Sequence, residues 1–213
     1  MLLLTNRRAE HAVLVGTGIG VTPFASILQS IAYRVKQVKK QCPSCDHTWA
    51  DDISGVMNSL KKVDFFWINR DQKSFEWFVN LLSELEMDMA ETGGALGRLL
   101  EMHMYITTGR VITDTGAVTY FFLSFLALQK TDMKSVFLQL AMDLNFKKEQ
   151  RDLVTGLKSR TNAGRPNWNK VFTKIKEQRK GKVTVFFCGN PMLGRVLKQK
   201  CNDFGFTFRK EVF

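Results

Sequence analysis

The sequence is poor in cysteine and has no long apolar run. Four cysteines among 213 residues are too few for a disulfide framework, so we expect reduced thiols, as in the cytosol. The longest apolar stretch, 117–128, is interrupted by Thr119 and Ser124 and is too short to cross a bilayer as a helix. The apolar residues 2–4 are too few for a signal-peptide core. We therefore expect neither a secretory leader nor a transmembrane segment in this chain.

Acidic residues are also scarce, 20 against 31 lysines and arginines, which gives a net charge of +11. A basic surface of this kind suits nucleotide phosphates, an anionic membrane or an acidic protein. The sequence carries no motif of a DNA- or RNA-binding module, so we expect no nucleic-acid partner. The length and the apolar fraction of 45% fit one α/β domain with its own core.

A strand, a glycine turn and a helix start follow one another over residues 11–24. Residues 12–15 are small or apolar and suit a strand that is covered on both faces. Glycines at 16, 18 and 20 let the backbone turn without a Cβ clash, and Pro23 suits the first turn of a helix. Because the first N–H groups of a helix have no partner within it, this turn is a candidate phosphate site. The alternative is a glycine-rich connector that binds no ligand.

The second predicted strand, 63–68, ends at Asn69 and Arg70. In a Rossmann domain that binds NAD, an acidic residue here bonds the ribose 2′-hydroxyl, whereas Arg70 suits a 2′-phosphate. One charge-assisted bond of about 1.5–3 kcal/mol corresponds to a preference of roughly tenfold to 150-fold for NADPH over NADH. The alternative is a surface arginine in a turn.

Strand and helix patterns alternate along the chain, so we predict a three-layer, Rossmann-like α/β domain with a mostly parallel five-stranded sheet. The domain is expected over 11–213, after a tail over 1–10, and an apolar insertion at 109–129 is left unplaced. The predicted strands are 12–15, 63–68, 103–107, 183–187 and 206–208, and the predicted helices are 22–40, 74–91, 131–146, 169–179 and 192–201. The third of these helices is predicted to bury Met133, Val136, Phe137, Leu140 and Leu144.

Four predicted strands end in glycine-containing or polar segments. Ligands of open α/β sheets bind at the carboxyl ends of the strands, so we expect these four segments to form one site. The segments are 16–20, 69–70, 107–108 and 188–191.

Cys42 and Cys45 form a C-x-x-C pair near His47, in a predicted loop over 41–60. A zinc site would need a further ligand that the nearby sequence lacks, and a thioredoxin-like pair would follow a strand and begin a helix. We therefore predict no metal site, while metal binding and redox activity stay open as alternatives for this pair. His103 alternates with its strand neighbours and is interpreted as a packed side chain, not a catalytic one.

The far end of the predicted helix 22–40 is basic. A solvated helix end that complements the helix dipole is the simpler interpretation. Basic residues mixed with apolar ones also resemble a calmodulin target or a membrane-surface helix. The basic residues are Arg34, Lys36, Lys39 and Lys40.

Five motifs follow one another in a fixed order. They are G-T-G-I-G-V-T-P-F at 16–24, W-I-N-R-D at 67–71, F-E-W-F at 75–78, G-R-P-N-W at 164–168 and F-F-C-G-N-P at 186–191, and Phe213 ends the chain. Together they resemble the NADPH-binding half of the dehydrogenase domain of the NADPH oxidases, in the ferredoxin–NADP reductase superfamily. C-P-S-C at 42–45 and F-F-W-I-N-R-D-Q at 65–72 most resemble the calcium-regulated oxidases of type five. The apolar 109–129 and the opening 1–8 do not match the family pattern.

The resemblance implies a role for each strand end. It implies that the glycine turn holds the cofactor pyrophosphate, that Arg70 holds the 2′-phosphate and that Arg165 lies on the adenosine side. Cys188 beside the nicotinamide and Phe213 on the flavin ring are the implied catalytic residues. The implied cofactor-binding residues are Gly16, Thr17, Gly18, Gly20, Thr22, Pro23, Asn69, Arg70, Thr107, Arg165, Pro166, Cys188, Gly189 and Pro191.

The resemblance also implies an activity. NADPH would pass a hydride to FAD, and electrons would then cross membrane haems to oxygen and form superoxide. The implied partners are an upstream FAD domain, a haem-bearing transmembrane domain, and calmodulin or a calcium-binding regulatory domain. The implied location is the cytosolic face of the plasma or endoplasmic reticulum membrane. Without the FAD domain we expect no turnover, and the alternatives are a flavin reductase for a soluble acceptor or a basic calmodulin-binding module.

Overall fold

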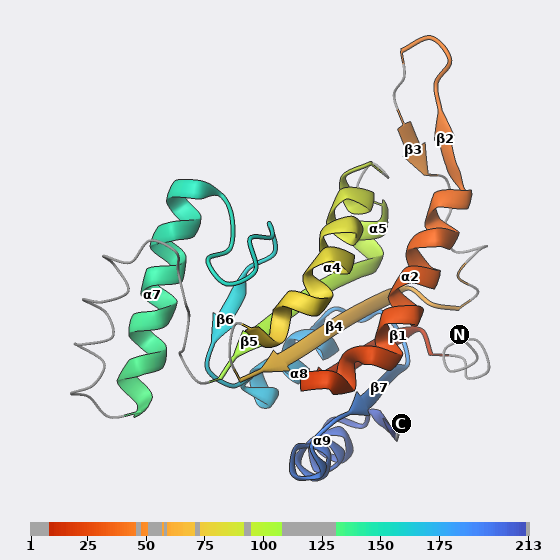
Figure 1. Cartoon of the computed structure of the whole chain (residues 1–213). Helices are drawn as coiled ribbons and strands as arrows, with labels where there is room; N and C mark the ends of the chain where they lie inside the picture. The colour runs from red at the N-terminus through yellow and green to blue at the C-terminus, as the bar shows by residue number, and fades with distance from the viewer. Residues whose placement is uncertain are drawn as a thin grey trace.

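A six-stranded parallel sheet forms the centre of the computed structural model, which describes residues 9–45, 48–50, 57, 59–70, 73–91, 95–107 and 131–211. The strand order is β6-β5-β4-β1-β7-β8, and every neighbouring pair is parallel (Figure 1). The strands are β1 His11–Thr17, β4 Lys62–Asn69, β5 Leu100–Ile106, β6 Thr161–Ala163, β7 Val183–Cys188 and β8 Thr207–Lys210. The predicted parallel α/β sheet is confirmed, with one more strand than predicted.

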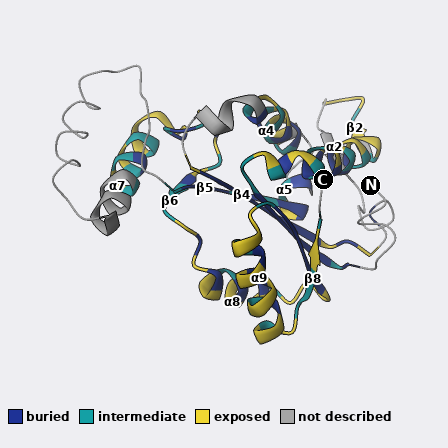
Figure 2. Ribbon diagram, turned by 60° about the horizontal axis from the view of Figure 1, so that its bottom comes forward, coloured by how far each residue is buried: buried dark blue, intermediate teal, exposed yellow. Residues whose placement is uncertain are grey.

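Helices cover both faces of this sheet, as Figure 2 shows. The helices α2, α4 and α5 pack on one face, and α8 and α9 pack on the other. The helix α7 lies beyond the edge strand β6 (Figure 1). The bounds are η1 Gly18–Val21, α2 Thr22–Gln37, α4 Lys73–Glu91, α5 Ala95–Leu99, α7 Thr131–Glu149, α8 Trp168–Glu177 and α9 Pro191–Phe204.

The central strands are buried on both sides because their apolar residues point alternately to the two helix layers. Leu14 and Phe65 belong to the core under α2 and α4, while Val15 and Phe66 belong to the core under α8 and α9. A continuous apolar strand is typical of a parallel sheet that is covered on both faces. The three-layer arrangement predicted from the sequence follows from this alternation.

The strand β6 was missed because it carries no apolar alternation. The buried carboxylate of Asp152 instead sets its start, accepting hydrogen bonds from the Thr161 backbone N–H at 2.8 Å and from the Thr161 hydroxyl at 2.8 Å. Pairing with β5, for example Ile106 with Ala163, completes the strand. A tertiary hydrogen bond therefore defines an element that periodicity does not indicate.

The first helix is shorter than predicted. It ends at Gln37, and the next residues form a hairpin in which β2, Lys39–Gln41, pairs with β3, Thr48–Ala50. The predicted helix end at residue 40 and the predicted loop over 41–60 are thus wrong in part. The backbone groups of Lys39 and Lys40 bond across the hairpin instead of along the helix. The helical basic segment keeps only Arg34 and Lys36.

In 139–149, the part of α7 whose side chains the structure describes, the buried residues differ from those predicted, while the predicted Met133, Val136 and Phe137 lie outside that part. Leu140 and Leu144 are 54% and 58% exposed, whereas Met142 is 3% exposed. The Gln139 side chain accepts a hydrogen bond from the Ala163 N–H at 2.8 Å, and this contact with β6 fixes the rotation of the helix. The prediction that Leu140 and Leu144 are buried is therefore wrong.

Several predictions concern residues outside the described part of the chain. These are residues 1–8 of the predicted tail over 1–10, the insertion at 109–129, His47 and Phe213. Among the helices of the described residues, none combines the length and apolar character that a membrane span requires.

Candidate functional site

The strand register brings the four predicted strand ends to one edge of the sheet. Gly16 at the end of β1 lies opposite Cys188 of β7 on one side and Trp67 of β4 on the other. Farther along, Ile106 of β5 lies between Asn69 of β4 and Ala163 of β6. The segments after β1, β4, β5, β6 and β7 therefore leave the sheet side by side.

The glycine turn after β1 is packed so closely that side chains are excluded. A Cβ on Gly20 would lie 2.6 Å from the carbonyl oxygen of Cys188, and one on Gly16 would lie 3.0 Å from the Cα of Val21. Gly18 has a φ of +55°, where other residues are strained. The indole N–H of Trp67 donates to the Gly18 carbonyl at 3.2 Å. Trp67 is a positioning residue that the sequence interpretation missed.

The amino end of α2 follows this turn without a capping side chain of its own. Its first turn has no acidic residue, and the N-cap position, Val21, offers no side-chain hydrogen bond. Thr22 is exposed and its hydroxyl donates to the Ile19 carbonyl at 2.7 Å, and Pro23 occupies the first turn. The Thr22 N–H bonds to the Ile19 carbonyl and Pro23 has no N–H, so the amino end of α2 offers an anion mainly its positive dipole end.

Thr17 joins the glycine turn to the end of β7. Its hydroxyl accepts a hydrogen bond from the Asn190 N–H at 3.1 Å. Gly189 has a φ of +144°, and a Cβ there would meet the Thr17 hydroxyl. Asn190 in turn caps α9 by accepting from the Met192 N–H at 2.8 Å, and Pro191 begins that helix. These contacts hold two of the predicted site segments together.

Cys188 ends β7 in a buried position, 7% exposed. Burial raises the pKa of its thiol, the Glu211 carboxylate raises it further, and Lys210 opposes them. The Glu211 N–H donates to the Phe187 carbonyl at 2.8 Å, so the chain runs toward its end beside β7. The thiol of Cys188 is consequently neutral near pH 7.

The ends of β4 and β5 are bonded to each other. Thr107 donates to the Asn69 carbonyl from its N–H at 2.9 Å and from its hydroxyl at 3.1 Å. Asn69 is 3% exposed, whereas the following Arg70 is exposed. Thr107 and Asn69 therefore shape the backbone from which Arg70 extends.

The turn after β6 lies beside the end of β5. The Gly164 N–H donates to the Ile106 carbonyl at 2.8 Å. Arg165 is exposed and Pro166 is buried, so Arg165 offers a second guanidinium at this edge. The structure thus brings together every predicted site residue that it describes.

A sequence model of the ferric reductase NAD-binding domain matches residues 9–202. The chain belongs to this family. It is 54% identical over 207 residues to human NADPH oxidase 5, a match that covers 96% of this chain and 24% of that protein. It is 30% identical over 225 residues to respiratory burst oxidase homolog protein F of Arabidopsis thaliana, covering 97% of this chain and 21% of that protein. The resemblance to NADPH oxidases is confirmed, and the chain spans about a quarter or less of these relatives.

A solved structure also resembles this member of the ferric reductase NAD-binding family. It contains the CS-b5R domains of human Ncb5or in the NAD+ form, with a TM-score of 0.47 and 13% identity. The match covers 96% of this chain and 37% of that one.

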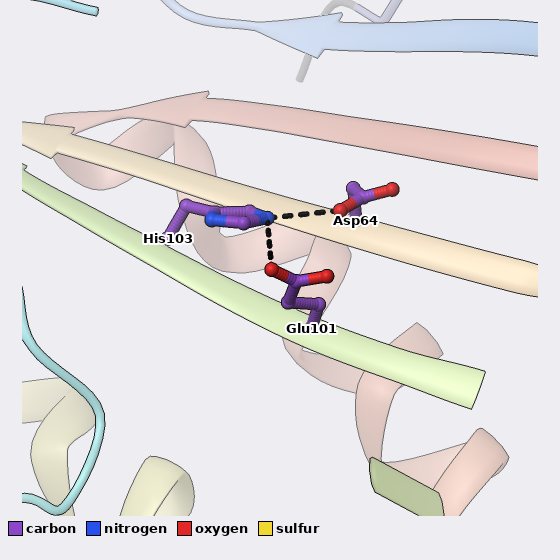
Figure 3. Close-up of side chains that lie close together, drawn as sticks. All are labelled: Asp64, Glu101 and His103. Atoms are coloured by element: carbon purple, nitrogen blue, oxygen red, sulfur yellow. Dashed lines mark hydrogen bonds and ion pairs between the residues drawn. The ribbon is translucent and has the colours of Figure 1, made fainter. Parts of the chain in front are cut away.

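The opposite edge of this NAD-binding domain holds a buried ionic cluster, drawn in part in Figure 3. Asp64 accepts from His11 Nε2 at 2.5 Å and from His103 Nε2 at 2.9 Å. Burial raises the pKa of Asp64, but the hydrogen bonds from His103 and His11 outweigh it and hold that pKa below its usual range. Glu101 lies 3.7 Å from His103 Nε2. These residues stand at the amino ends of β1, β4 and β5, away from the candidate site.

The same cluster could hold a metal ion by its ligand types, but its charges are already compensated. Lys62 and Lys174 lie 3.2 and 3.3 Å from the Glu101 carboxylate, and two imidazoles contact Asp64. His103 also stacks on Phe66 with 4.4 Å between ring centroids. The cluster is therefore interpreted as part of the folded core, in agreement with the interpretation of His103 as a packed side chain.

Proposed function

We propose that the chain is the NADPH-binding part of a transmembrane NADPH oxidase. In this role it presents NADPH to FAD, which the rest of the protein holds, for superoxide production from oxygen. The observation that carries the proposal is the close approach of the glycine turn to the end of β7, where Gly20 abuts the Cys188 carbonyl. This contact supports the proposal, because the turn proposed for the pyrophosphate lies beside the segment proposed for the nicotinamide.

The pyrophosphate of NADPH fits the turn between β1 and α2. Gly16 and Gly20 let the turn pack against Val21 and Cys188, while a Cβ at Gly18 would meet nothing within 4 Å, and the positive dipole end of α2 follows the turn. Thr22 and Pro23 belong to that first turn. Thr17 positions the turn through Asn190 and offers its hydroxyl proton to a phosphate oxygen.

The adenosine 2′-phosphate is proposed to bind Arg70. The guanidinium is exposed at the carboxyl end of β4, and the Asn69–Thr107 contact fixes the backbone beneath it. Arg165, with Pro166 buried behind it, would line the adenosine side. A planar guanidinium matches phosphate geometry through two parallel hydrogen bonds.

The nicotinamide is proposed to lie beside Cys188 and Gly189, with Pro191 in the same turn. NADPH supplies the hydride, and the flavin that receives it belongs to another domain. Because its thiol is neutral, Cys188 is proposed to orient the nicotinamide ring by packing against it and not to act as a base. Phe213, which lies outside the described residues, is proposed to lie on the flavin ring.

The proposed setting is a multidomain membrane protein. We propose 11–213 as the NADPH-binding domain and 1–10 as a tail, with an upstream FAD domain and a haem-bearing transmembrane domain. The chain would lie at the cytosolic face of the plasma or endoplasmic reticulum membrane. Calmodulin or a calcium-binding regulatory domain would contact the basic end of α2, which retains Arg34 and Lys36.

Flavin reduction tests this function directly. The purified FAD domain of a homologous oxidase is mixed with this chain under anaerobic conditions, and flavin bleaching is followed after NADPH is added. We expect rapid bleaching with both components and none with this chain alone. The Gly97→Ala variant is the control for a substitution away from the proposed site. It should support flavin reduction as the wild type does, because a Cβ at Gly97 would meet nothing within 4 Å. If the mixture reduces no more flavin than the FAD domain alone, the proposed function is wrong.

A further inference from the structure

Two of the four cysteines lie together in an exposed turn outside the candidate nucleotide site. The hairpin of β2 and β3 projects beyond the end of α2, away from the sheet (Figure 1). Cys42 follows β2 directly and is half-buried, and Cys45 is exposed. Residues 43–45 form a turn, which begins directly after Cys42 and includes Cys45. The pair is thus accessible from solvent on a surface that the nucleotide does not use.

Cys42 and Cys45 stand at the first and fourth positions of one turn. The Cys42 sulfur accepts hydrogen bonds from the Ser44 backbone N–H, the Cys45 thiol and the Cys45 backbone N–H. These hydrogen bonds, of which the one from the Ser44 N–H has the largest effect, lower the pKa of the Cys42 thiol. The Ser44 hydroxyl lowers this pKa further, and burial opposes the shift only slightly. In a tight turn the first and fourth Cα atoms lie within about 7 Å, which is also the limit for a disulfide, about 7 Å.

We propose that Cys42 and Cys45 form a reversible disulfide when hydrogen peroxide is present. The Cys42 thiolate attacks one peroxide oxygen, an S–O bond forms, the O–O bond breaks, and the leaving hydroxide takes a proton to become water. The Cys45 thiolate then attacks the Cys42 sulfur, an S–S bond forms, and the second oxygen leaves as water. The two thiols are oxidised by two electrons in total, and one peroxide is reduced to two waters.

The other two cysteines provide a contrast within the same chain. Cys201 is fully buried, and burial raises the pKa of its thiol to about 12. Cys188 is buried and its pKa is also raised, mainly by burial. Because the thiolate is the reactive form, neither should compete with Cys42 for peroxide. Cys188 and Cys201 are therefore internal controls for the exposed pair.

The inference does not depend on the proposed oxidase function, because peroxide can be supplied from outside. If that function holds, dismutation of its superoxide would generate the same oxidant. A failure of NADPH binding would leave the dithiol chemistry intact, and a failure of disulfide formation would leave NADPH binding intact. The two proposals are tested by separate readouts.

Thiol labelling and mass spectrometry test the proposal on the full chain. The chain is treated with hydrogen peroxide at neutral pH with a chelator present, then alkylated with N-ethylmaleimide and digested. We expect the peptide with Cys42 and Cys45 to lose the mass of two hydrogen atoms and all labelling, and a dithiol reductant to restore both. Before oxidation, we expect Cys42 to be alkylated at least about tenfold faster than Cys201.

Two variants separate the roles of the cysteines. In Cys45→Ser the disulfide cannot form, so we expect a sulfenic acid at Cys42 that dimedone captures. In Cys42→Ser we expect several-fold less dimedone adduct at Cys45. Continued labelling of both thiols after peroxide would overturn the proposal. So would protection of both thiols that is seen only when the chelator is left out, since that result would identify a metal site instead.

Discussion

At the scale of single residues, Gly20 carries a close backbone contact between the two halves of the proposed site. Its missing side chain lets the glycine turn lie against the Cys188 carbonyl, 2.6 Å from where a Cβ would stand. The Cys188 backbone cannot move aside as a flexible side chain can. A larger residue at position 20 must therefore push the turn away from β7.

The Gly20→Ala variant is therefore expected to lose stability and NADPH affinity together. We expect a loss of roughly 1–3 kcal/mol in the free energy of unfolding, measured by urea denaturation, and weaker NADPH binding by calorimetry. Gly97→Ala, in the helix α5, is the matched control and should be neutral or more stable by about 0.5–1 kcal/mol. Equal stability of the two variants would contradict the packing described at Gly20.

Asp64 is a second residue whose surroundings define a measurable property. Its carboxylate is 1% exposed and faces His11 and His103, with Glu101 nearby. Because its pKa in the folded chain lies below the unfolded value, ionised Asp64 stabilises the fold above that unfolded value, about 3.9. This stabilisation is lost as the pH falls through the folded pKa.

We expect Asp64→Asn to cost about 3–5 kcal/mol near neutral pH, because it leaves a buried network incomplete. The difference from the wild type should shrink by up to about 1.4 kcal/mol for each pH unit below about 4. Urea unfolding at a series of pH values measures both quantities. A difference that stays constant down to the lowest pH would show that Asp64 does not ionise as described.

At the scale of elements, the helix α7 depends on contacts that its own sequence does not reveal. Its rotation follows the Gln139–Ala163 hydrogen bond and the burial of Met142. Two leucines, Leu140 and Leu144, stay exposed.

Paired variants on α7 test this rotation. Met142→Ala should cost about 2–5 kcal/mol of unfolding free energy, because it opens a cavity in the core. Leu144→Ala should change stability by less than about 0.5 kcal/mol. Thermal and urea unfolding of both variants provide the comparison, and the reverse order of losses would mean that the helix packs through its leucines.

The same elements explain how far the sequence could predict the fold. Strongly apolar strands such as β1, β4 and β7, and the helix α4, were predicted because burial on both faces or on one stripe leaves a clear pattern. The short strands β2, β3 and β6 have no such pattern, since partner strands and the Asp152 carboxylate define them.

The residues of the candidate site also differ in how far the sequence could predict them. The glycine turn and Arg70 could be found because their residue types and their places after strands carry the chemistry. Trp67 could not, because it acts through a hydrogen bond to the Gly18 carbonyl. Asn190 lies in the predicted segment 188–191, but its hydrogen bond to the start of α9 was not predicted. A buried Trp at a strand end carries an N–H that needs a partner, and this was the available signal for Trp67.

At the scale of the whole molecule, the two edges of the sheet have different tasks. The carboxyl edge gathers the glycine turn, Arg70 and Cys188, while the amino edge holds the Asp64 cluster. Changes at the amino edge should therefore alter stability without altering the choice of nucleotide. The net charge of +11 favours any anion, so it cannot by itself separate NADPH from NADH.

Arg70 is proposed to select NADPH by binding the 2′-phosphate of this nucleotide. The direct measurement is the ratio of the Kd values for NADH and NADPH, determined by calorimetry at one salt concentration for the wild type, Arg70→Ala and Lys180→Ala. Lys180 is an exposed residue before β7, so its variant loses the same charge at the opposite edge. We predict a preference of roughly tenfold to 150-fold for NADPH in the wild type and in Lys180→Ala, and almost none in Arg70→Ala. An unchanged preference in Arg70→Ala would contradict the account.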